Sequence, residues 1–240
     1  MVIELGSIYL IRHGQASFGA DDYDVLSPLG VQQAEILGDH LIATGVTLNA
    51  CFSGDMLRQK DTALAALARF SEANLAAPNL NIDSAFNEID VDSIIRLLVP
   101  KMLDQEPHAI ESLRNPLQDK TEFQRLFSMI MQRWATGIDD IPDHLNWSTF
   151  TQTVDAGLQR VLDNAAPNDH IGIFTSGGTI TACLHLLTGL PARNAFDLNW
   201  QIVNTSLSRL KFRNDSVVLT SFNSHAHLDL LKNKKLITYR

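Results

Sequence analysis

The chain has 240 residues and a formal net charge of −8, with 45% hydrophobic and 19% charged residues. This length supports one α/β domain with a sizeable core, and the composition is that of a globular protein. An acidic chain without runs of lysine and arginine is a poor partner for nucleic acid or an anionic membrane, so the sequence favours a small ligand. A monomer and a homodimer are both compatible with it.

The two cysteines, Cys51 and Cys183, lie in apolar stretches and have neither disulfide-scaffold nor zinc-site spacing. The N-terminal segment lacks the basic region and cleavage site of a secretory signal, and no apolar run is long enough to cross a membrane. We therefore expect buried thiols and a cytoplasmic protein.

The first third of the chain twice repeats a strand followed by a helix. Residues 7–11 form an apolar, branched run that ends at Arg12 and His13, and residues 48–53 form a second such run. Ser27 and Pro28 are typical of a helix start, and the helix should stop near Gly45. Another helix is predicted over 56–70. Eight residues are expected to face the core from these two helices: Val31, Ala34, Leu37, Leu41, Leu57, Leu64, Leu67 and Phe70.

The middle third, residues 90–143, shows no strand alternation, and prolines at positions 100, 107, 116 and 142 interrupt it. These features predict short helices joined by turns. One helical face carries an apolar stripe made of Phe123, Leu126, Phe127, Ile130 and Trp134. We expect a single domain over 1–240 with a helical insertion over about 90–145 that forms a lid.

The last third returns to the earlier pattern. A helix bearing Phe150 and Val154 precedes a strand over 170–175, and Ser176, Gly177 and Gly178 then lead into a helix over 179–187. Strands over 206–212 and 216–222 are predicted to form a hairpin through residues 213–215.

Alternating strands and helices predict a three-layer α/β/α fold with a mostly parallel sheet and an antiparallel edge formed by the closing hairpin. In such sheets ligands bind beyond the carboxyl ends of the strands. Arg12, His13, Ser53 and Ser176 should all emerge at that edge.

Four segments resemble the histidine phosphatase superfamily, whose members have a phosphoglycerate mutase-like fold. IYLIRHGQASFGADDYDVLSPLG resembles its Arg-His-Gly signature, and CFSGDMLRQKDTA resembles the strand and helix that carry a phosphate-binding arginine. IGIFTSGGTITACLHLL and NTSLSRL resemble the two late strands of that family. The resemblance spans nearly the whole chain except the middle third.

The resemblance implies a phosphatase that hydrolyses a small phosphomonoester through a phosphohistidine. His13 would be the nucleophile, and Arg12 and Arg58 would hold the phosphoryl oxygens with paired hydrogen bonds. Glu88 would be the general acid, with Asp90 and Asp92 as competitors. The scheme requires no metal and no cofactor, and the implied ligand is a small phosphorylated metabolite or inorganic phosphate.

Ser176 stands where most members of the family have a second histidine. A serine hydroxyl and the backbone N–H of Gly177 at a helix start can still bind phosphate, but a cationic donor is lost. The same serine is also compatible with a plain turn residue. A catalytically impaired phospho-ligand sensor and a phosphoglycerate mutase-type phosphotransferase are therefore the alternatives. A dinucleotide-binding domain would need a G-x-G-x-x-G motif after the first strand, and the sequence lacks it there.

His225 and His227 alternate by two, so on a strand both side chains would face the same side. A metal site would need a third ligand, and none is evident in the sequence. A second hypothesis is that one of these histidines reaches the phosphate pocket in place of the missing one.

Overall fold

The computed structural model describes residues 5–17, 24–114, 119–214 and 216–239. Within them six strands form one sheet in the order β3-β2-β4-β1-β5-β6. In chain order the strands are β1 (Gly6–Arg12), β2 (Ala50–Ser53), β3 (Leu80–Ile82), β4 (His170–Thr175), β5 (Leu207–Arg213) and β6 (Ser216–Ser224).

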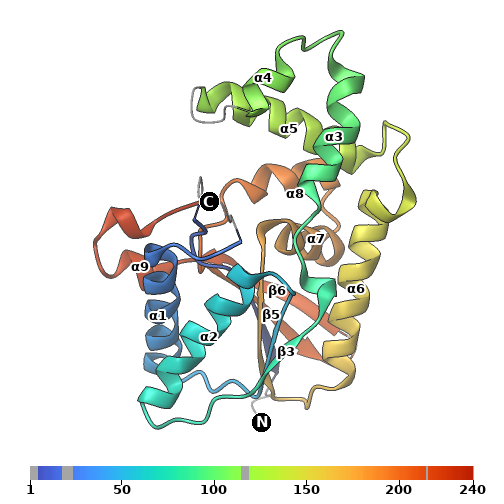
Figure 1. Cartoon of the computed structure of the whole chain (residues 1–240). Helices are drawn as coiled ribbons and strands as arrows, with labels where there is room; N and C mark the ends of the chain where they lie inside the picture. The colour runs from blue at the N-terminus through green and yellow to red at the C-terminus, as the bar shows by residue number, and fades with distance from the viewer. Residues whose placement is uncertain (1–4, 18–23, 115–118, 215, 240) are drawn as a thin grey trace.

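The sheet is parallel on one side of β1 and antiparallel on the other. Strand β1 pairs in parallel with β4, which continues through β2 to β3, while β5 and β6 are antiparallel. Helices α1 (Pro28–Ala43) and α2 (Leu57–Glu72) cover one face, and α6 (Trp147–Asp163) and α7 (Gly177–Thr188) cover the other (Figure 1). The three-layer α/β/α prediction, with its antiparallel closing hairpin, is confirmed. Residue 215 of that hairpin lies outside the described residues.

Strand β1 is the central element because its side chains pack on both faces. Ile8 and Leu10 belong to the core beneath α6 and α7, whereas Tyr9 and Ile11 belong to the core beneath α1 and α2. Side chains alternate between the faces of a strand, so a continuous apolar run is required at a position covered on both sides. This burial holds the end of β1 rigidly at the sheet edge.

Helices α1 and α2 begin near the expected positions. The Ser27 side chain accepts a hydrogen bond from the N–H of Gly30 at the start of α1, as its capping role predicts. The expectation that Val31, Leu57 and Leu64 face the core is wrong, because these side chains are exposed on the outer helix surfaces. The other five inward residues are buried.

The middle segment contains α3 (Val91–Met102), α4 (Ala109–Arg114) and α5 (Lys120–Thr136), gathered at one end of the molecule (Figure 1). Pro100 was expected to interrupt a helix, but it lies inside α3. Proline has no N–H, so α3 lacks the hydrogen bond from position 100 to the carbonyl of Arg96, and the helix ends two residues later. Pro116 lies outside the described residues. Leu126, Ile130 and Trp134 are buried on the inner face of α5.

The remaining elements are short helices and turns. They are α8 (Ala192–Asn199), α9 (Ala226–Asp229) and the 3-10 turns Ser84–Phe86, Asp143–Leu145 and Lys234–Leu236. Strand β3 is not predicted from the sequence, because three residues, two of them exposed, carry too little pattern. None of the described helices has the length and apolar character needed to span a bilayer.

Candidate functional site

His13 lies directly after β1, at the carboxyl edge of the parallel strands. Its N–H donates to the carbonyl of Thr175 at the end of β4 (2.8 Å), and its carbonyl accepts from Asn204 Nδ2 (2.9 Å). These bonds tie the residue to the neighbouring strand and to the segment before β5. The side chain is only 3% exposed.

The orientation of the His13 imidazole follows from its two hydrogen bonds. Nδ1 lies 2.7 Å from the carbonyl oxygen of Gly14, which can only accept, so Nδ1 carries the proton. Burial lowers the pKa of His13 well below its usual value, and the charges of Arg12 and Arg58 lower it further, against the opposing effect of the Gly14 carbonyl. The ring is therefore neutral near pH 7, with a lone pair on Nε2.

Arg58, on the first turn of α2, faces that lone pair. Its Nε donates to His13 Nε2 (3.3 Å), and its Nη1 forms an ion pair with Asp24 Oδ1 (2.7 Å). The N–H of Leu57 donates to the other Asp24 oxygen, so the carboxylate also caps α2. Asp24 thus holds the Arg58 guanidinium against the His13 ring.

Arg12 is the last residue of β1 and directly precedes His13. One Arg12 Nη1 donates to the carbonyl of Ile202, in the segment that connects α8 to β5. The charge of Arg12 lowers the pKa of His13, as the charge of Arg58 does, so two guanidinium groups act on one buried imidazole. Two such groups can hold a phosphoryl group by paired hydrogen bonds.

Ser176, Gly177 and Gly178 form the start of α7, at the end of β4. Ser176 is fully buried, and its Oγ accepts from Gln59 Nε2 (2.8 Å). The N–H of Gly178 donates to Glu88 Oε1 (3.0 Å), and a Cβ at position 178 would lie 2.2 Å from that same oxygen. Glycine at position 178 leaves room for this approach, which brings Glu88 to the start of α7.

The competing acids do not share this position. Asp90 is exposed and caps α3 by accepting from the N–H of Ser93 (3.1 Å), and Asp92 is exposed on the first turn of the same helix. Among the three, Glu88 is the one whose hydrogen bonds join it to the residues after β4.

His225 and His227 do not lie on a strand, so the condition under which both side chains would face the same side is not met. His225 precedes the short helix α9 and pairs with Asp229, while His227 lies inside α9 and is buried. Among the described residues there is no group of three or more His, Cys, Asp or Glu side chains that could hold a metal.

His227 contacts Thr205 rather than the His13 ring. The Thr205 hydroxyl donates to the carbonyl of Asn204 (2.7 Å), so its oxygen accepts the proton of His227 Nε2 (3.2 Å). Thr205 has a left-handed backbone (φ 58°), and its N–H donates to the carbonyl of Arg12 (3.1 Å). The contact thus supports the backbone beneath the site.

The pH dependence of stability should report the buried His227. Burial, with smaller effects from His40 and His225, lowers the pKa of His227 to about 3. Below the usual pKa of histidine, His227 is protonated in the unfolded chain but stays neutral in the folded chain. The free energy of unfolding therefore falls as the pH falls toward 3. We expect a loss of about 1.4 kcal/mol per pH unit from this residue, and urea unfolding at pH 7 and pH 5 measures it.

His227→Gln keeps a donor for Thr205 but cannot titrate, so the loss on acidification should become smaller by about 2 kcal/mol. The exposed His108 is the matched control, since His108→Gln should leave the loss unchanged. An equal loss in wild type and His227→Gln would contradict the assignment.

Sequence reasoning missed three residues of this site. Asp24 follows two other acidic positions in a polar loop, and nothing marks it as the partner of Arg58. Gln59 looks like one more polar helix residue. Asn204 lies directly before β5 at the same sheet edge, and that position is the one signal that could have identified it. The rest of the loop, residues 18–23, lies outside the described residues.

Comparisons with known proteins identify the family of the chain. The model of the histidine phosphatase superfamily (branch 1) matches residues 8–225. The chain therefore belongs to the histidine phosphatase superfamily. Comparison with curated protein sequences gives no match.

Solved structures share the fold at low sequence identity. A phosphoglycerate mutase from Bacillus anthracis is 16% identical with a TM-score of 0.61, over 96% of this chain and 98% of that one. A phosphoserine phosphatase mutant from Entamoeba histolytica, in complex with phosphoserine, is 18% identical with a TM-score of 0.62 (93% and 99%). A mycobacterial glucosyl-3-phosphoglycerate phosphatase is 18% identical with a TM-score of 0.61 (91% and 99%).

Proposed function

We propose that this protein is a phosphatase that hydrolyses a small phosphomonoester through a phosphohistidine at His13. The observation that carries the proposal is the state of that ring: it is buried and neutral, its Nδ1 proton is engaged by Gly14, and its Nε2 faces the Arg58 guanidinium. A neutral imidazole nitrogen beside two arginines is suited to attack phosphorus.

In the first step Nε2 of His13 forms a bond to phosphorus while the bond from phosphorus to the substrate alcohol breaks. Arg12 and Arg58 hold the phosphoryl oxygens and stabilise their charge in the transition state. Glu88 gives the leaving oxygen a proton. Its Oε1 already accepts from Gly178 and Ile89, which leaves Oε2 to carry that proton.

In the second step a water molecule attacks the phosphohistidine. Glu88, now a carboxylate, takes the proton of that water, the N–P bond breaks, and phosphate leaves. In this proposal the N–H of Gly177 also faces a phosphoryl oxygen, since the start of α7 favours an anion. Helices α3 to α5 would be the expected lid over the alcohol portion of the substrate.

Ser176 supports a second candidate, a phospho-ligand sensor with impaired catalysis. We infer that this serine replaces the second histidine of the family, and its hydroxyl is engaged by Gln59 in the fully buried position. It adds no positive charge to the transition state. The intact His13 with its two arginines favours the phosphatase.

One experiment separates the two candidates. The protein is incubated with p-nitrophenyl phosphate, release of p-nitrophenol is followed, and the reaction is quenched to trap an acid-labile phosphoenzyme. We expect turnover together with a phosphoenzyme mapped to His13. Binding of inorganic phosphate without turnover and without this adduct would reject the phosphatase in favour of the sensor.

A further inference from the structure

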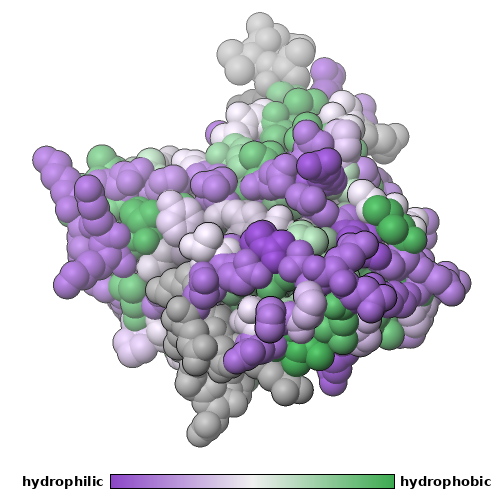
Figure 2. All heavy atoms as spheres, turned by 90° about the horizontal axis from the view of Figure 1, so that it is seen from above, coloured by the Kyte–Doolittle hydropathy of each residue, from purple (hydrophilic) through white to green (hydrophobic). Residues whose placement is uncertain are grey.

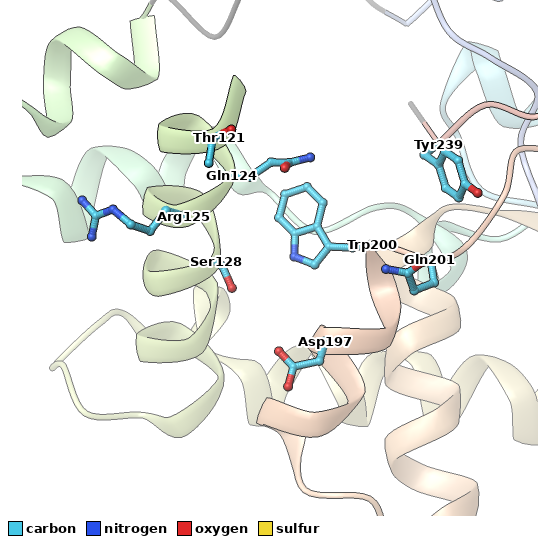
Figure 3. Close-up of a pocket in the computed structure, with 8 residues that line it drawn as sticks. All are labelled: Thr121, Gln124, Arg125, Ser128, Asp197, Trp200, Gln201 and Tyr239. Carbon is cyan, nitrogen blue, oxygen red and sulfur yellow. The ribbon is translucent and has the colours of Figure 1, made fainter. Parts of the chain in front are cut away.

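A cavity of about 620 Å³ lies between α5, α8 and the C-terminal segment. Figure 3 shows the indole of Trp200 between side chains of α5 on one side and Gln201 and Tyr239 on the other, with Asp197 below it. The eight lining residues are Thr121, Gln124, Arg125, Ser128, Asp197, Trp200, Gln201 and Tyr239. The volume is in the usual range for small-molecule sites.

Two lining residues of this cavity, Gln201 and Tyr239, have a chain neighbour that forms a hydrogen bond with a residue of the His13 site. Gln201 precedes Ile202, whose carbonyl accepts from Arg12. Tyr239 follows Thr238, whose hydroxyl donates to Asn204 Oδ1 (2.9 Å), and Asn204 in turn donates to the His13 carbonyl. Consecutive residues are about 3.8 Å apart along the chain, so these two lining residues of the cavity lie close to the residues that surround His13.

The cavity offers a fixed aromatic surface. Phe127 packs edge-on against the Trp200 indole, with ring centroids 5.3 Å apart, so the indole is held by α5 as well as by its own backbone. Around it stand the amides of Gln124 and Gln201 and the hydroxyls of Thr121 and Ser128. Such a surface suits a ring that carries several hydroxyl groups.

The charge of the cavity discriminates against anions. Arg125 is the only cationic residue among its described lining residues, and its guanidinium points away from Trp200 (Figure 3). It donates at 2.6–2.8 Å to carboxylate oxygens of Glu106 and Glu122, so its charge is neutralised. Asp197 adds a carboxylate. A substrate carboxylate in this cavity would meet repulsion without a compensating cation.

We propose that the alcohol portion of the substrate is an uncharged ring with vicinal hydroxyls, a sugar or a nucleoside, which stacks on Trp200 and donates two hydroxyls to Asp197. The inference rests on the proposed phosphatase function and specifies its substrate class. A three-carbon acid such as phosphoglycerate would leave most of the cavity filled by water and would face Asp197. Seen from above, the surface is largely hydrophilic, and hydrophobic residues form separate areas on it (Figure 2).

The test compares kcat/KM for glucose 6-phosphate, a nucleoside 5′-monophosphate, 3-phosphoglycerate and p-nitrophenyl phosphate. We expect kcat/KM for glucose 6-phosphate or for the nucleoside 5′-monophosphate to exceed that for 3-phosphoglycerate by tenfold or more. Comparison of the two ring substrates distinguishes a sugar from a nucleoside. In Asp197→Asn, kcat/KM for the preferred diol relative to p-nitrophenyl phosphate should fall by about tenfold or more, because hydrogen bonds to a charged group contribute roughly 1.5–3 kcal/mol.

Asp163→Asn is the matched control, since it removes an exposed carboxylate of α6 outside the cavity and should leave this ratio unchanged. Preference for 3-phosphoglycerate, or a ratio that Asp197→Asn leaves within twofold, would overturn the inference. Absence of p-nitrophenyl phosphate turnover would instead contradict the phosphatase function. In that case calorimetry on His13→Ala still tests the inference, because the ring phosphates should bind more tightly than 3-phosphoglycerate.

Discussion

His13→Ala is expected to lower kcat for p-nitrophenyl phosphate by a factor of about 10⁴ to 10⁶, the scale seen when a covalent nucleophile is removed. The reason is that no other described imidazole has a lone pair beside Arg58, so the phosphoenzyme cannot form. Initial rates and acid-quenched phosphoenzyme yields measure the effect. The variant should still bind inorganic phosphate, because Arg12, Arg58 and the start of α7 remain.

His108→Ala is the matched control, because His108 is exposed and lies between α3 and α4. It should keep wild-type rates. Thermal melting of both variants shows whether His13→Ala is folded, and retained phosphate binding shows that its site is intact. More than a tenth of wild-type turnover in a folded His13→Ala, or an acid-labile adduct on it, would remove His13 from the mechanism.

Arg58→Ala is expected to lower kcat by roughly 10² to 10³, the usual cost of one lost transition-state donor. The loss has two parts in this structure. The guanidinium no longer meets the phosphoryl oxygens, and Asp24 is left with its charge facing the incoming phosphate. Arg58→Lys should recover only part of the rate, because an ammonium keeps the charge without the planar pair of donors.

Arg69→Ala tests the same change at the other end of α2. Arg69 is an outer-surface residue that pairs with Asp39 and Glu72, so its loss should leave kcat and KM near wild type. If Arg58→Ala and Arg69→Ala had equal effects, or if Arg58→Lys kept full activity, the phosphoryl-holding role of the Arg58 fork would be rejected.

Much of the fold could be predicted because its central strands are strongly patterned. The run before Arg12 and the run over 170–175 are apolar on both faces, and both proved to be parallel strands buried from either side. The start of α1 was predictable from local chemistry, since Ser27 caps the helix with its own side chain.

Other elements escaped prediction for identifiable reasons. Leu57 and Leu64 fit an apolar helical spacing, but the narrow face that α2 turns toward the sheet is filled by Ala63, Ala66, Leu67 and Phe70. Strand β3 depends on pairing with β2, a contact that its three residues do not encode. The short helix that contains His227 was not predicted, because its four residues carry too little pattern.

The sequence by itself determined that Arg12 and His13 stand at the end of a buried strand, and that Arg58 lies at the start of a helix that follows a second buried strand. Apolar runs and helix starts are properties of neighbouring residues, so the sequence carries them. Only the tertiary structure decided what surrounds the His13 ring. Asp24 against Arg58, Gln59 against Ser176, and Glu88 against Gly178 join residues 34, 117 and 90 positions apart. Such contacts arise from the way the strands meet at one sheet edge, so no local pattern carries them.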